Sequence, residues 1–124
     1  MTTHVRLLAD EQVILVTHVG HVGQPEMQAA GEKGFAMARE TGIWRFLSDC
    51  SALIEGPRIV DQLELAQLLQ AMGVSDRYRQ ALVRPASIDA AETVLEWETV
   101  SVNRGISVRV VPDVETGLQW LQQT

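Results

Sequence analysis

The sequence has little that would suit a secreted, membrane-spanning or nucleic-acid-binding protein. Only one of its 124 residues is a cysteine, so no internal disulfide can form, and we expect the reducing cytoplasm as its compartment. Ten Lys and Arg stand against sixteen Asp and Glu, and the net charge of −6 repels phosphate backbones and disfavours nucleic-acid binding. No apolar run approaches the roughly 20 residues of a membrane span, and a signal peptide is not expected.

Sequence signatures of common catalytic sites are also missing. There is no GxSxG elbow for a serine nucleophile, and neither GHVG nor GEKG has the setting of a phosphate-binding loop. His18 and His21 lie three residues apart, a spacing that on a strand sends the two side chains to opposite faces of a sheet. We therefore expect no metal and no cofactor. An enzyme, which would rest on Asp49, Cys50 and a histidine, ranks last among the function classes.

The residue pattern predicts one α/β domain covering residues 1–124, since a chain of this length buries roughly two-thirds of its unfolded surface around one core. Strands are expected at residues 4–8, 12–19, 43–51, 78–84 and 106–111, and helices at 24–41, 58–72, 88–103 and 113–123. The polar link ADEQ favours an antiparallel hairpin at the start, and the alternation of helices with later strands favours largely parallel pairing. The expected fold is a mixed five-stranded sheet with four helices, in the order ββαβαβαβα.

Three glycines support this order. Gly42, Gly73 and Gly105 each follow a helical pattern and precede a β-branched residue, in TGIW, MGVS and RGIS. Glycine accepts the left-handed backbone angles that end many helices, and the next residue then makes an apolar contact. These three sites therefore predict three separate exits from a helix into a strand.

The whole pattern resembles a SpoIIAA-like protein of the STAS superfamily, in an uncharacterised branch related to CRAL-TRIO lipid-binding domains. The resemblance is carried by GHVGQPE at residues 20–26, LSDCS at 47–51, NRGISVRVV at 103–111 and GLQWL at 117–121. It implies a mixed sheet covered by helices. In the anti-sigma antagonists of this superfamily, a serine at a helix start is phosphorylated, but here the corresponding segment reads EGPR at 55–58 and has no hydroxyl. We therefore expect no phosphoswitch.

Polar residues gather where the third and fourth expected strands end. Asp49, Ser51 and Arg58 lie at one strand end and Arg84 and Ser87 at the next, so together they are a candidate site for a ligand or a partner. The alternative, which we favour, is local: Asp49 and Ser51 bond nearby backbone groups and Arg58 is solvated.

Three further side chains each allow a structural and a functional interpretation. Cys50 alternates with apolar residues and is expected to be a core thiol. Counting from Ile88 places Ala91, Leu95 and Val102 on one helix stripe and Trp97 nearly opposite. Either the helix begins in a different register, or Trp97 is exposed as a candidate interface anchor. Trp120 is expected to dock on the sheet, with a ligand slot beneath the last helix as the alternative.

The sequence leaves three functions open. The first is a non-catalytic regulatory or protein-interaction domain, binding a protein partner or itself as a homodimer. The second is a carrier or sensor for a small apolar or anionic ligand, or a lipid. An enzyme of unknown class is the third.

Overall fold

The computed structural model describes residues 2–74 and 76–123, and its elements follow the predicted order. The strands are β1 (Thr2–Leu8), β2 (Val13–His21), β3 (Arg45–Glu55), β4 (Arg79–Val83) and β5 (Ser107–Val111). The helices are α1 (Gln24–Thr41), α2 (Ile59–Ala71), α3 (Ile88–Val102) and α4 (Val114–Leu121). None of the helices within these ranges has the length and apolar character needed to cross a membrane.

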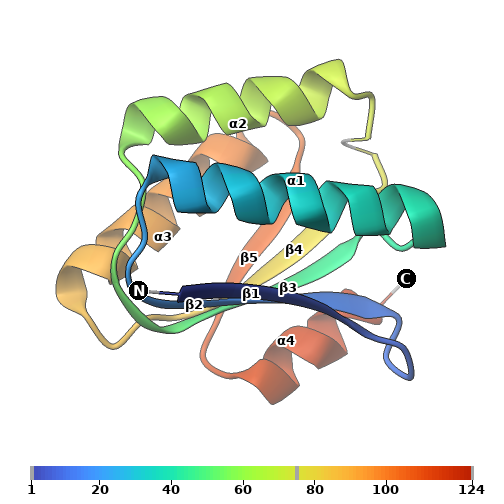
Figure 1. Cartoon of the computed structure of the whole chain (residues 1–124), viewed down its shortest axis with the longest axis horizontal. Coiled ribbons are helices and arrows are strands. Elements are labelled where there is room, and N and C mark those ends of the chain that lie inside the picture. The colour runs from blue at the N-terminus through green and yellow to red at the C-terminus, as the bar shows by residue number, and fades with distance from the viewer. Residues whose placement is uncertain (1, 75, 124) are drawn as a thin grey trace.

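One five-stranded sheet in the order β1-β2-β3-β4-β5 forms the centre of the domain. The pair β1–β2 is antiparallel and all later pairs are parallel, which confirms the predicted mixed sheet with a hairpin at its start. Crossovers between parallel strands are right-handed. Because each crossover adds its strand on the same side of the strand before it, α1, α2 and α3 lie on the same face of the sheet. Figure 1 shows these three helices on one side of the sheet and α4 on the other.

The three predicted glycine exits are confirmed. Gly42, Gly73 and Gly105 have φ angles of 75°, 69° and 74°, in the left-handed region where a side chain would strain the backbone. Of the residues that follow them, Val74 and Ile106 are buried. Each exit therefore ends its helix and starts the return of the chain toward the sheet.

The face of α3 that meets the core differs from the expected one. The buried residues are Ala90, Val94, Trp97, Val100 and Ser101. The expected inward stripe instead points outward: Ile88, Leu95 and Val102 are 78%, 50% and 57% exposed. The interpretation of Trp97 as an exposed interface anchor is wrong, because its side chain is only 7% exposed and its indole N–H bonds Gln80.

The face of the sheet under α4 is tightly filled. A Cβ atom at Gly117 would lie 2.8 Å from Leu47 Cδ1, so only glycine allows this helix to approach so closely. Arg79 lies over the Trp120 ring, 4.1 Å from its centroid, and donates a hydrogen bond to the Trp120 carbonyl. The predicted docking of Trp120 is confirmed, because the ring packs against the buried cluster on this face of the sheet.

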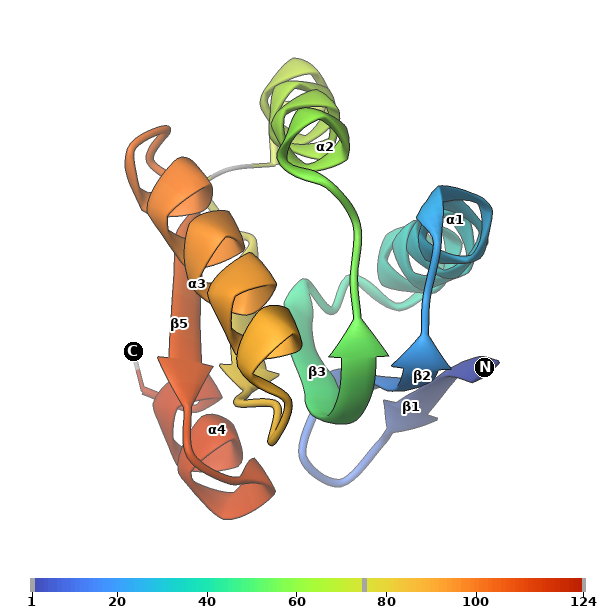
Figure 2. The same ribbon diagram turned by 90° about the vertical axis from the view of Figure 1, so that its left-hand side faces the viewer.

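Helix α2 stands away from the sheet. Both α1 and α3 approach strands closely, whereas the main neighbour of α2 is α3 (Figure 2). Three of its apolar side chains, Ile59, Val60 and Leu68, are 44–49% exposed, so much of the apolar surface of this helix faces solvent. The stand-off leaves space between α2 and the sheet.

Candidate functional site

A cavity of about 370 Å³ lies between the sheet and the helices α1, α2 and α3. The cavity is mostly apolar, with walls that include Met27, Phe35, Phe46, Leu65, Leu82 and Val94. Its exposed lining residues, Gln28, Glu32, Glu64 and Leu68, all come from α1 or α2, so the entrance lies between these two helices. This volume is within the range of pockets that hold small molecules in proteins.

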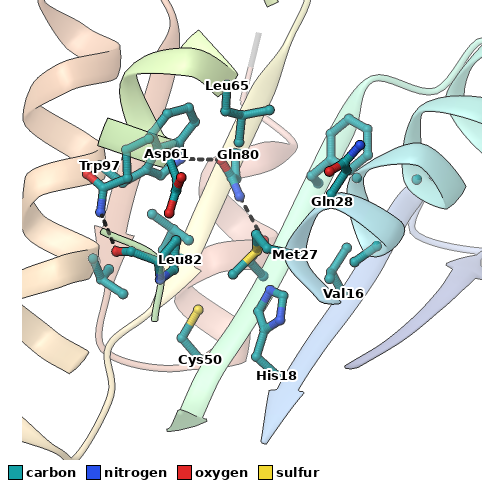
Figure 3. Close-up of a pocket in the computed structure, with 18 of the residues that line it drawn as sticks. Val16, His18, Met27, Gln28, Cys50, Asp61, Leu65, Gln80, Leu82 and Trp97 are labelled. Carbon is teal, nitrogen blue, oxygen red and sulfur yellow. Dashed lines mark hydrogen bonds between the residues drawn. The ribbon is translucent and has the colours of Figure 1, made fainter. Parts of the chain in front are cut away.

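A neutral hydrogen-bond network is built into the floor and wall of the cavity. The Gln80 side-chain oxygen accepts from Trp97 Nε1 at 2.8 Å and from the Tyr78 hydroxyl at 3.0 Å. Gln80 Nε2 donates to Ser48 Oγ at 2.8 Å. Burial raises the pKa of Tyr78 well above its usual range, so its hydroxyl stays protonated. These bonds join β3, β4 and α3 and hold Ser48, which lines the cavity. Figure 3 shows Gln80 and Trp97 within this part of the cavity.

His18 of β2 also lines the cavity and is uncharged at neutral pH. Its side chain is 4% exposed, and burial lowers its pKa to about 4, although the charge of Asp49 acts weakly in the other direction. Its Nδ1 lies 3.3 Å from the Thr3 hydroxyl. Figure 3 shows the ring beside Cys50, on the helix-covered face of the sheet.

Cys50 shares the cavity with His18, which brings together the two groups on which a thiol enzyme would depend. Burial, and secondarily the charge of Asp49, raises the pKa of Cys50 to about 12. A protonated thiol beside a neutral imidazole lacks the charge separation that activates cysteine nucleophiles. The predicted burial of Cys50 is confirmed, since the residue is only 3% exposed.

The strand expected to end at Asp49–Ser51 continues to Glu55, so the predicted strand end is wrong. The cause is β2, whose last residues pair with Ala52, Leu53 and Glu55 and extend the sheet. Asp49 Oδ1 accepts hydrogen bonds from both the Ser51 backbone N–H, at 3.1 Å, and the Ser51 hydroxyl, at 2.7 Å. These two residues therefore satisfy each other locally.

The remaining members of the predicted cluster are also used locally. The Ser87 hydroxyl caps α3 by accepting from the Ala90 backbone N–H, and it donates to the Ile54 carbonyl. Arg58 precedes α2, has a side chain that is 83% exposed, and faces Asp61 at 3.9 Å. Arg84 follows β4 and is exposed. None of the five cluster residues lines the cavity, and their binding role stays a prediction.

His21 does not join His18. His21 is exposed, with its Nδ1 3.8 Å from Glu55, while the side chain of His18 is buried. Across residues 2–74 and 76–123 no three His, Cys, Asp or Glu side chains are grouped closely enough to hold a metal ion.

The residues that define the cavity were not identified from the sequence as a site. His18, Ser48 and Gln80 each stand as a single polar residue at an inward position of an otherwise apolar strand. That pattern is the available signal, because a buried polar side chain must find partners and often marks a ligand site. It becomes informative only when three neighbouring strands show it on the same face.

Comparison with solved structures supports the fold assignment. The chain is similar to the crystal structure of an uncharacterised DUF3478-family protein with a SpoIIAA-like fold from Shewanella loihica PV-4. The match has a TM-score of 0.59 and 11% sequence identity, and it covers 97% of this chain and 92% of the other. No protein-family model matches the sequence, and no curated protein matches it. The predicted SpoIIAA-like fold is thus confirmed.

Proposed function

We propose that this protein is a non-catalytic carrier or sensor domain that binds a small, largely apolar molecule between its sheet and α1, α2 and α3. The observation that supports the proposal is the cavity of about 370 Å³, which has apolar walls and a few fixed polar groups. A small α/β domain otherwise packs its interior to crystal-like density, so a space of this size at the centre of the helix layer calls for an occupant.

Gly31→Leu tests the proposal because Gly31 lines the cavity and has room for a side chain. A Cβ atom there would meet only Phe35, at 4.0 Å, so leucine enters free space without a backbone clash. Replacing glycine inside a helix also stabilises it by about 0.5–1 kcal/mol. We therefore expect Gly31→Leu to raise the melting temperature and to abolish ligand binding, a combination that an unfolded variant cannot produce.

The measurement is native mass spectrometry of the purified protein, which reports any co-purifying mass. The control is Ala29→Leu, an exposed position on the same helix outside the cavity, which should retain the bound mass. A wild-type protein that carries no mass and binds no apolar probe would refute the carrier or sensor function.

A second candidate function, regulation through protein binding, is favoured by the outer face of α3. Ile88, Leu95 and Val102 repeat every seven residues, so they form one exposed apolar stripe along the helix. Pairing of two copies through this stripe would bury it. If the chain self-associates, Leu95→Glu should convert dimers to monomers in sedimentation experiments, while Glu96→Gln, which is exposed and beside the stripe, should not. A wild-type protein that is monomeric at all concentrations would rule out self-association.

A further inference from the structure

The charges around the cavity are of one sign. Three carboxylates, Glu32 of α1 and Asp61 and Glu64 of α2, line it, and among the described lining residues there is no lysine or arginine. Asp61 has Arg58 as a partial neighbour at 3.9 Å, but the Arg58 side chain is largely in solvent and does not line the cavity. An anion entering between α1 and α2 would therefore pass a negative rim and find no cation inside.

The few polar groups inside the apolar cavity are uncharged. Ser48 accepts a hydrogen bond from Gln80 Nε2, so its own hydroxyl proton is free for donation, and within the described chain it has no acceptor. His18 Nδ1 lies beside Thr3, which leaves Nε2 without a hydrogen-bond partner among residues 2–74 and 76–123. Val16 of β2 pairs with Ser48 of β3 in the parallel ladder. His18 is two residues beyond Val16 on the same face, so it lies about 7 Å further along the strand.

From this arrangement we infer that the cavity selects an uncharged amphiphile, with an apolar body against the Phe46 and Leu65 walls and a hydroxyl or carbonyl group at Ser48 and His18. This inference rests on the ligand-binding function proposed above and excludes the anionic ligands that the sequence left open. Burying a carboxylate without a partner cation is costly, whereas a hydroxyl or carbonyl is satisfied by one or two neutral hydrogen bonds. The imidazole of His18 also favours an uncharged ligand, because its low pKa of about 4 leaves the ring neutral near pH 7.

Isothermal titration with three eight-carbon probes, 1-octanol, octanoate and octylammonium at pH 7.5, tests the inference. We expect 1-octanol to bind at least tenfold more tightly than either charged probe. Ser48→Ala should weaken 1-octanol binding by about fivefold, the effect of one neutral hydrogen bond. Octanoate or octylammonium binding as tightly as 1-octanol would overturn the inference but leave the proposed function standing.

Removing the rim charges tests the cause of the selectivity. The triple variant Glu32→Gln, Asp61→Asn, Glu64→Gln should bind octanoate several-fold more tightly than the wild type does, with little change for 1-octanol. Glu115→Gln, at an exposed site on α4 across the sheet, is the matched control and should change neither affinity. Unchanged octanoate binding in the triple variant would overturn the role assigned to the rim. Failure of all three probes to bind the wild type would overturn the inference, and native mass spectrometry then decides separately whether any ligand is carried.

Discussion

At the scale of single residues, the polar side chains beneath the helices carry the hydrogen-bonding chemistry of the cavity. Ser48, Gln80 and Trp97 hold one another through two hydrogen bonds of 2.8 Å, and Tyr78 completes the set. Hydrogen bonds between buried side chains rigidify their surroundings, and here they leave the Ser48 hydroxyl proton for a ligand. Gln80 is the centre of this arrangement, because its carboxamide contacts all three partners.

The burial of His18 predicts a dependence of stability on pH. Its pKa is lowered from 6.5 to about 4 in the folded protein, so the unfolded chain binds more protons between these two values. The stabilising contribution is present above pH 6.5 and is lost as the pH falls toward 4. We expect the free energy of unfolding to drop by roughly 2 kcal/mol from this residue between pH 7.5 and pH 5.

Urea denaturation at the two pH values measures this drop in the free energy of unfolding. His18→Gln removes the titrating group and should flatten the dependence, whereas His21→Gln, at an exposed position, should not. An equally steep loss of stability in the His18→Gln protein would show that other groups cause it.

Among the secondary-structure elements, α2 differs from its neighbours in how it is held. Both α1 and α3 pack closely on strands, whereas α2 packs mainly on α3 and borders the entrance of the cavity. A helix with few buried apolar contacts opens at a lower free-energy cost than the rest of the structure.

Hydrogen exchange should detect this difference. We expect the backbone amides of α2 to exchange faster than those of α1 and α3, and a ligand in the cavity to slow α2 most, because the occupant supplies the missing apolar contacts. Equal protection of the three helices in the unliganded protein would contradict this picture.

The helices also show how far sequence reasoning reaches. The ends of α1, α2 and α3 were predictable because glycine at Gly42, Gly73 and Gly105 has a local backbone cause. The buried face of α3 was not, because that helix has two apolar stripes, one through Ile88 and Leu95 and one through Trp97. The inward stripe packs on residues distant in the sequence, and Trp97 also donates a hydrogen bond to Gln80 there.

At the scale of the whole molecule, the fold was predictable and the site was not. Strand and helix order follow from patterns within about fifteen residues, and the SpoIIAA-like arrangement agrees with them. The cavity depends on α2 standing off the sheet, which is a property of how three helices share one face. The polar cluster predicted at Asp49 and Ser51 was plausible by composition, but a longer β3 turns these residues toward each other.

The spatial order of the strands is the same as their order along the chain. In many open α/β sheets the direction in which successive strands are added reverses once. The two loops that diverge at that reversal form the crevice in which ligands bind. Here β1 to β5 succeed one another without such a reversal, so no crevice of that kind is available at the carboxyl edge. Under the proposed binding function, a change of ligand preference is therefore expected to follow substitutions in the sheet and helix surfaces that line the cavity.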